Sequence, residues 1–486
     1  MKKLISFASI AIIFASVQGQ YVTDALRYSQ VFPAVTARSM AMGSAFSSLG
    51  GDYSSALINP AGLGLYRKSE VVVTPGFVFS KTSSSYLGVK NDDSRYQFHL
   101  GNAGFVGTYN TDKDKGLVSA SFLTGYNRLS DFGSSTYIQG VNADNSLVDL
   151  FVQNADGIDP ENLEPFYERL AFDAYMIDTI PGSTFEYTNP IAFLPITQRK
   201  IIETEGGSGE WRFAMGLNFS NVFYFGMGLG LQRLRYDQTA THSEYDFDNL
   251  NNDFNLFHYT EDLRVDGYGI NANFGMMARL FKIMRIGGSL QIPTYYNITE
   301  DYYNTMYSEF DNGDNYFVSP TDQNGDLLAH GTFEYKLNTP LKLQGGASVQ
   351  IGKIGIVSAD VEFIDYSAMH LGEKDPYADF SGSNNAIEST YRSVVNLKLG
   401  GEARFGGLAL RLGGGFYPSP YESDELNSDA SYSEITTGIG YRNDILFFDF
   451  GFSRVAYSEN YILYFNNVAN LDQARYRFLT TFGVRF

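Results

Sequence analysis

The chain has 486 residues with 49 Gly, 35 Tyr and 39 Phe, and only 18% of its residues are charged. This composition is rich in strand and turn formers, and no apolar run beyond the N-terminus reaches the roughly 20 residues of a spanning helix, which excludes a helical membrane protein. The net charge of -19 argues against nucleic acid as a partner. It fits acidic loops in water, whose carboxylates either meet divalent cations or have no partner.

The first segment, residues 1–19, has the pattern of a secretory signal peptide. A basic start, MKK, precedes the apolar run LISFASIAIIFASVQG, and small residues precede the expected cleavage after Gly19. A membrane anchor is the alternative, but the run is short for a spanning helix. Without Cys, the chain has neither a disulfide framework nor a lipidated N-terminal cysteine. We therefore expect an exported protein that begins near Gln20.

Small residues and turns dominate the next segment, residues 20–69. The run TARSMAMGSAFSSLGG would allow close packing, and Pro60, Gly62 and Gly64 would turn the chain into the first strand.

A strand-like pattern then recurs in fourteen segments, and TQRKIIETEGG is counted as an extension of the fourth. Short turns alternate with long polar loops between them, which is typical of an outer-membrane barrel. The segments are residues 70–80, 94–110, 115–131, 209–220, 222–240, 256–281, 283–302, 330–351, 354–368, 390–405, 408–421, 430–445, 446–464 and 473–486.

The last strand carries the clearest lipid-facing pattern. In RYRFLTTFGVRF, mostly aromatic and aliphatic residues occupy every second position and end in Phe486, while Arg477 and Arg485 lie on the other face. A strand between lipid and an aqueous lumen requires this alternation, and the terminal Phe resembles the assembly signal of outer-membrane barrels. An edge strand of a soluble sandwich is the alternative. With the signal peptide, the pattern predicts an all-β fold, a 14-stranded antiparallel transmembrane β-barrel over residues 70–486.

A 14-stranded barrel would have an open lumen unless a segment of the chain filled it. About eight strands leave an interior that side chains fill, whereas 16–18 strands leave an open channel. We therefore expect residues 20–69 to form an N-terminal plug inside the barrel. The alternative is an ordinary helix and loop in the periplasm.

An apolar insertion is predicted at residues 145–196. Its apolar side chains recur at roughly helical spacing among acidic residues, which favours two short amphipathic helices. They form either a hydrophobic ligand groove or the packing that closes the loop. The residues assigned to the groove are Leu147, Leu150, Phe151, Leu163, Phe166 and Leu170.

Signals for chemistry are few. The five His residues have no metal-ligand spacing, and GMGLGLQ at 226–232 sits within a strand, where packing or barrel curvature explains it better than a phosphate loop. The segments DNGDN and DQNGD lack the full ligand pattern of a calcium loop. No Ser lies in a nucleophile-elbow pattern, so an enzyme is a minority hypothesis. We expect no cofactor, no metal and no catalytic residues.

One stretch resembles a known family. The run ARSMAMGSAFSSLGGDYSSALINPAGLGLY is similar to the N-terminal hatch of the FadL/TodX family of outer-membrane hydrophobe transporters, which ends in an Asn-Pro-Ala motif before the first strand. Asn59, Pro60 and Ala61 match that motif, and the Gly-Glu-Trp at 209–211 looks closest to Bacteroidetes-type members. The hatch match covers about 30 residues, and the rest of the resemblance is architectural.

The resemblance implies passive uptake of hydrophobic small molecules, fatty acids or aromatic hydrocarbons, across the bacterial outer membrane. The ligand would be caught in the outer groove, pass beside the plug and diffuse sideways through a kink in an early strand. We place this lateral opening at Gly125, because Gly inside a strand often marks a bend. The expected partners are hydrophobic ligands, outer-membrane lipids and the barrel assembly machinery, and the expected state is a monomer. The alternatives are a barrel that binds partner proteins in secretion or surface assembly, a haem receptor, and a barrel hydrolase.

Overall fold

A computed structural model describes residues 21–31, 36–251, 253–281, 283–319, 330–374 and 378–486. The expected signal peptide, residues 1–19, lies outside this range. No helix within the described ranges has the length and apolar character needed to cross a membrane.

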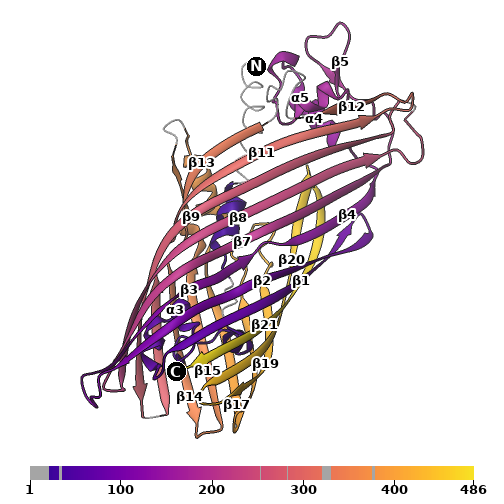
Figure 1. Ribbon diagram of the computed structural model, residues 1–486. Helices are drawn as coiled ribbons and strands as arrows, with labels where there is room; N and C mark the ends of the chain where they lie inside the picture. The colour runs from indigo at the N-terminus through magenta and orange to yellow at the C-terminus, as the bar shows by residue number, and fades with distance from the viewer. Residues whose placement is uncertain (1–20, 32–35, 252, 282, 320–329, 375–377) are drawn as a thin grey trace.

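The chain forms a closed antiparallel β-barrel of 14 strands (Figure 1), as the sequence predicted. Several strands consist of two segments. In chain order they are β1 (Glu70–Tyr86), β2 (Val89–Asn110), β3 with β4 (Leu117–Asp131, Ser134–Asn142), β7 (Ile196–Phe219), β8 (Phe223–Tyr245), β9 (Leu256–Leu280), β10 with β11 (Met284–Gln291, Tyr295–Glu309), β13 with β14 (His330–Asn338, Lys342–Ile351), β15 with β16 (Gly355–Asp365, His370–Glu373), β17 (Ser393–Phe405), β18 (Leu408–Tyr417), β19 (Tyr432–Arg442), β20 (Leu446–Tyr464) and β21 (Asn467–Arg485).

The two ends of the barrel differ in their connections. Turns such as Gly406–Gly407 join strands at the end where β1 begins. Most connections at the other end are longer, although Leu87–Gly88 and Phe465–Asn466 are two-residue turns there. The connections at the long-loop end carry further elements: α4 (Leu147–Ala155), η2 (Pro160–Asn162), α5 (Glu168–Asp173), β5 (Asp178–Thr179), β6 (Tyr187–Thr188), β12 (Asn315–Val318), η3 (Tyr366–Ala368) and α6 (Ser381–Thr390).

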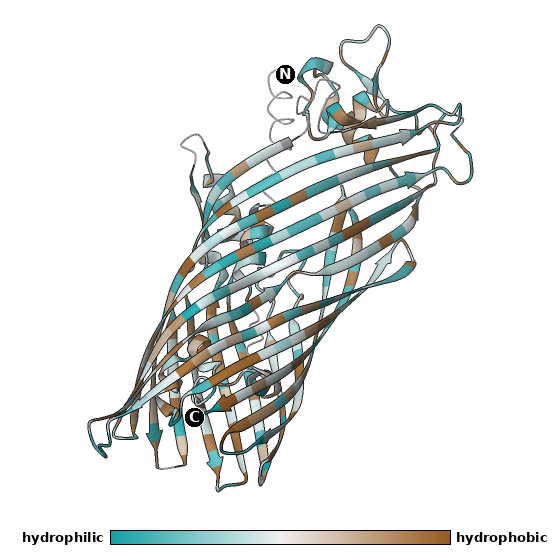
Figure 2. Cartoon of the chain, viewed as in Figure 1, coloured by the Kyte–Doolittle hydropathy of each residue, from teal (hydrophilic) through white to brown (hydrophobic). Residues whose placement is uncertain are grey.

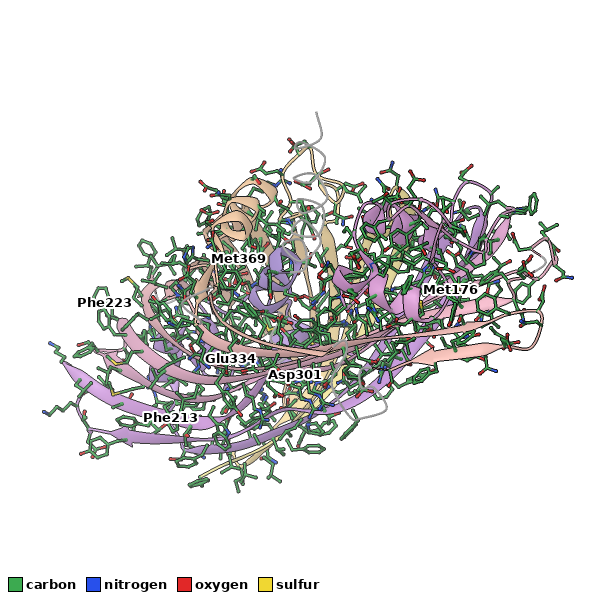
Figure 3. The ribbon with its side chains drawn as sticks, turned by 90° about the horizontal axis from the view of Figure 1, so that it is seen from above. Met176, Phe213, Phe223, Asp301, Glu334 and Met369 are labelled. Carbon is green, nitrogen blue, oxygen red and sulfur yellow. The ribbon has the colours of Figure 1, made fainter. Side chains whose placement is uncertain are left out.

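Hydropathy alternates along many strands (Figure 2), and exposed apolar side chains occupy the outer face of strands toward the short-turn end. On β8, every second side chain from Phe223 to Leu231 is exposed and apolar, and the exposed residues that follow are Arg233 and Arg235. Nine residues at about 3.3 Å each, tilted by roughly 45°, span about 20 Å, close to the height of the lipid-facing band in outer-membrane barrels. Seen from above, Phe213 and Phe223 lie on the outside of the barrel (Figure 3).

The barrel closes between its first and last strands. Glu70 pairs with Arg485 in register, and their side chains form an ion pair of 2.9 Å. Phe486 exchanges two backbone hydrogen bonds with Ser69, both 3.1 Å, and its ring stacks on Phe105. Along β21, Phe482 and Val484 are exposed while Leu479 and Thr481 are buried, which is the alternation expected from the sequence.

Candidate functional site

The segment that precedes β1 lies in the lumen at the short-turn end. It contains α2 (Ala37–Ala41), α3 (Ser55–Ile58) and η1 (Pro60–Leu65), and nearly all of its residues are buried. Hydrogen bonds join it to separate parts of the wall: the amide of Ala37 donates to Thr481 on β21 at 2.8 Å, and Ser47 donates to Asp360 on β15 through both its amide and its hydroxyl. The segment therefore extends across the lumen between these strands.

The Asn-Pro-Ala motif holds the last turn of this segment against β9. Asn59 accepts a hydrogen bond from the amide of Ala61 at 3.1 Å, which caps η1. Its side-chain amide donates to the carbonyl of Ser47 at 2.6 Å and to that of Met276 on β9 at 3.1 Å. Pro60 opens the 3-10 turn, where it needs no amide partner. One Asn side chain thus joins two parts of the segment and the wall.

Glycines in the barrel wall face this segment on most strands. A Cβ atom at Gly451 would lie 2.6 Å from the carbonyl oxygen of Ala37, and one at Gly226 would overlap the backbone of Pro60. The segment therefore packs backbone to backbone against the wall, which side chains would prevent. GMGLGLQ thus contributes to packing, in agreement with its position within a strand. The wall glycines that meet the segment are Gly104, Gly125, Gly216, Gly226, Gly275, Gly287, Gly346, Gly400, Gly413, Gly438 and Gly451.

A buried ion-pair network ties the segment to β17, β18 and β20. Arg38 contacts Glu402 at 2.9 Å, and Arg411 bridges Glu402 and Asp449 at 2.7 Å each. Arg442 also contacts Asp449 at 2.7 Å. Breaking one partner of such a buried pair leaves an uncompensated charge, which costs several kcal/mol, about 3–5 in measured cases. The network therefore fixes the position of α2 in the lumen.

Above this segment the lumen contains a polar cavity of about 90 Å³. Its lining includes Lys342, Lys398 and Glu362, with apolar contributions from Leu57, Ile58 and Ile364. Glu362 accepts hydrogen bonds from Lys398 at 3.2 Å and from Asn396 at 2.9 Å, and the ammonium of Lys342 lies 3.4 Å from the carbonyl of Ser29. Two ammonium groups share one carboxylate in this part of the lining.

A second cavity of about 310 Å³ lies beside the first, next to β3 and β4. Its lining includes Ser130, Phe132 and Ser134, together with Arg475 and Tyr457 from β20 and β21. It places an internal space directly behind the connection between β3 and β4.

The wall is discontinuous at that connection. β2 pairs with β3 over Asn102–Asn110, but its residues 89–101 pair with β1 alone among the described strands. β4 pairs with β7 and lies against the inner side of the β1–β2 hairpin, where Ser80 and Ser84 donate to the carbonyls of Gly133 and Tyr137. We call this break in pairing the seam.

Polar side chains close the seam. The carbonyl of Gly206 on β7 accepts hydrogen bonds from Arg128 of β3 at 2.8 Å and from Gln97 of β2 at 3.4 Å. Arg95 of β2 forms an ion pair with Glu205 of β7. The contacts of Arg95 and Gln97 bridge β2 and β7, for which no ladder joins the described residues, so side chains hold the seam across this gap.

No protein-family model matches the sequence, and comparison with curated proteins finds no match. Solved structures do match. The toluene transporter TodX of P. putida superposes with a TM-score of 0.54 at 11% identity, over 93% of this chain and 99% of that chain. A Pseudomonas aeruginosa FadL homologue gives 0.55 at 12% identity over 94% and 98%, and the Ralstonia pickettii toluene transporter TbuX gives 0.52 at 14% identity over 93% and 99%.

The chain has the FadL/TodX barrel fold.

Within this FadL-like barrel, the apolar insertion forms a packed cap on the long-loop rim. Phe151 and Leu170 are 2% and 1% exposed, and they pack with Phe254, Phe257 and Met306 from the barrel. Leu147 and Leu163 are also buried in this cluster, and Leu150 and Phe166 are partly buried against it. None of the six residues assigned to a groove lines the two lumenal cavities above. The described geometry is that of a loop core.

Polar contacts fasten the cap to β8. Glu244 accepts hydrogen bonds from the amide of Leu147 at 2.9 Å and from Ser146, the N-cap of α4. In α5, burial raises the pKa of Glu168, whose carboxylate accepts a hydrogen bond from Asn154 at 2.9 Å. Figure 3 shows Met176 in this cap and Met369 near α6 on separate parts of the rim.

Gly125, the residue chosen for the lateral opening, lies in a regular part of β3. It pairs with Gly104 on β2 and Arg212 on β7, and the ring of Tyr53 covers it from inside. Pairing with β2 ends two residues later, at Asn127, and the β3–β7 register shifts between Arg128 and Ser130. The seam therefore begins just beyond Gly125, and the bulge in β3 marks it.

Proposed function

We propose that this protein is an outer-membrane channel for passive uptake of hydrophobic small molecules. The observation that carries the proposal is the seam, because this break in strand pairing lies beside an internal cavity and is bridged by side chains, whose rearrangement would open a sideways path to the surrounding lipid. The solved structures that share the fold include toluene transporters and a FadL homologue, which supports the same function. A signal peptide at residues 1–19, a plug at residues 20–69 and a monomeric barrel inserted by the assembly machinery complete the proposal.

The ligand we favour is an acyl chain with an anionic head. The lining of the central cavity carries one more cationic than anionic side chain, so an added carboxylate would meet a surplus positive charge. The cationic residues are Arg212, Lys342, Lys398 and Arg477, and the anionic ones are Glu210, Glu362 and Glu434. A hydrocarbon would leave the surplus charge uncompensated, and burying an uncompensated charge is costly. The lining thus favours a fatty acid over toluene.

The seam can be tested by crosslinking, because the chain contains no native Cys. A Cβ atom at Gly133 would lie 2.6 Å from Oε1 of Gln97, so Gln97→Cys with Gly133→Cys places two thiols across the seam. As a control, Thr108→Cys with Ser121→Cys replaces hydroxyls that are 3.1 Å apart on paired parts of β2 and β3.

A short, reducible thiol crosslinker should abolish uptake of a labelled long-chain fatty acid by cells that carry the seam variant, and a reductant should restore it. The control pair should take up the label before and after crosslinking. Unchanged uptake by a fully crosslinked seam variant would contradict lateral exit.

A further inference from the structure

A groove on the outer face of the barrel lies across β2, β3, β7, β8 and β9. Its volume is about 600 Å³, and among the described residues that line it Thr124 alone has a polar side chain. Phe122, Phe213 and Met227 in its lining are exposed, and Phe213 lies on the outside of the barrel (Figure 3). The groove therefore opens toward the surrounding lipid and not toward the lumen.

Two rows of outward side chains, paired in register from strand to strand, form the sides of the groove. One row is Phe122, Met215, Met227 and Phe274. The other row is Phe105, Thr124, Phe213, Leu229 and Ala272. Between the rows, Leu123 and Ala214 are buried and Gly228 has no side chain, so backbone forms most of the floor.

The length and direction of the groove fit a single long acyl chain. Neighbouring strands lie about 4.8 Å apart, so the groove from β2 to β9 is roughly 19 Å long. Because it runs across strands that tilt by roughly 45° in such barrels, the groove is inclined to the bilayer normal by about the same angle. A phospholipid has two chains joined to one headgroup at the membrane surface, which keeps them from lying along this direction. A free fatty acid has one chain and can do so.

The groove lies next to the start of the seam. Tyr126 of β3 pairs with Trp211 of β7, and their rings meet edge to face at 6.4 Å between centroids. This ring pair lies between the groove residues Thr124 and Phe213 and the start of the seam at Asn127. A chain that leaves the seam therefore meets two aromatic rings and then the groove.

We propose that this groove is an exit-side binding site for the acyl chain of a fatty acid, which occupies it after leaving the seam and before mixing with the bulk lipid. This inference rests on the proposed function. Between the two rows the chain contacts side chains along both of its sides, and many small dispersion contacts add up. Met215 and Met227 are flexible side chains, so the groove adapts to chains that differ in shape.

The first test uses Trp211, the one Trp of the chain, as a contact reporter beside the groove. Bromine atoms quench indole fluorescence only at short range, so dibromostearic acid is titrated into vesicles of unbrominated phosphatidylcholine that carry the full chain. A comparison protein, Trp211→Phe with Phe416→Trp, moves the reporter to β18 across the barrel. Trp211 and Phe416 are 55% and 48% exposed, and each lies eight residues from the short-turn end of its strand, at Phe219 and Leu408.

We expect dibromostearic acid to replace phospholipid beside the indole of the native chain about fivefold more readily than in the comparison protein. Thr124→Phe should remove this difference, because a ring there fills the gap in its row between Phe105 and Phe213. Thr437→Phe, the same change at an exposed position of β19, should leave the difference unchanged. Thr124 faces outward, so quenching by acid bound in the lumen would persist in Thr124→Phe.

Equal quenching of the two reporters, or a difference that survives Thr124→Phe, would overturn the groove as a binding site. Stronger quenching of Trp211 by a brominated phosphatidylcholine than by the acid would overturn the fatty acid as its occupant. None of these results depends on uptake, so the proposed function would still stand.

The second test asks whether the groove lies on the path of uptake. Cells that carry Thr124→Phe should take up a labelled long-chain fatty acid several times more slowly than cells that carry Thr437→Phe, at equal amounts of heat-modifiable barrel, because release of the ligand is slowed. Equal rates would overturn the exit role and leave the proposed function standing. If the parent takes up no fatty acid, the proposed function fails, and the exit role fails with it.

Discussion

Replacing Asn59 by Ala should release the plug segment without disturbing the barrel. The side chain makes three hydrogen bonds, to Ser47, Met276 and Ala61, and none of them belongs to the strand ladder. Only the bond to Met276 joins the segment to the wall, and at about 1 kcal/mol net its loss weakens docking by about 1 kcal/mol. Since 1.4 kcal/mol corresponds to a factor of ten, the ratio of undocked to docked segment should rise by about fivefold.

Conductance across planar bilayers measures this ratio, because an undocked segment opens a lumen wider than side chains can fill. We expect brief large openings to become about fivefold more frequent in Asn59→Ala than in the parent. Asn312→Ala, in an exposed loop where Asn312 bonds only locally to Asp314, is the matched control. Equal opening frequencies in all three proteins would refute the assignment of Asn59 as an anchor of a lumenal plug.

Two further changes test other parts of the molecule. Phe486→Asp should reduce the heat-modifiable fraction on gels, because it places a charge on the lipid face and removes the ring that stacks on Phe105; normal assembly would contradict this. Phe151→Asp, Phe166→Asp and Leu170→Asp together remove side chains worth about 1.5–3 kcal/mol each, so the cap should become protease-sensitive and uptake should fall while the barrel persists; unchanged uptake would favour the partner-binding alternative.

The strand pattern was predictable because its cause is local. Lipid outside and a lumen inside impose a period of two on each strand, which the chain shows from Phe223 to Leu231 and again up to Phe486. Turn residues separate the segments, so strand number followed as well. The Asn-Pro-Ala motif was also visible, since its capping bond joins residues two apart in sequence.

The seam and the cap required long-range information. Gly125 was chosen on a local property, but the break depends on where β4 rests, and that is set by Ser80 and Ser84 from a distant strand. In the insertion, the helical spacing could be read from the sequence. The residues that pack with Phe151 could not, because they include Phe254, Phe257 and Met306, which lie far away in the chain. The wall glycines follow no period in sequence, because a position needs Gly only where the plug segment passes.

The lumenal segment that precedes β1, with α2, α3 and η1, also constrains the order in which the molecule is built. Its residues precede β1, yet they contact β15 and β17 to β21, and the helix before them, residues 21–29, reaches the long-loop end. A closed barrel leaves no side entrance for a folded segment of this width. The segment must therefore already lie on the concave side of the sheet before β1 pairs with β21. Formation of the β1–β21 hydrogen bonds then encloses it. Closure of the barrel and enclosure of the segment then occur in the same step. No barrel with an empty lumen therefore forms during assembly.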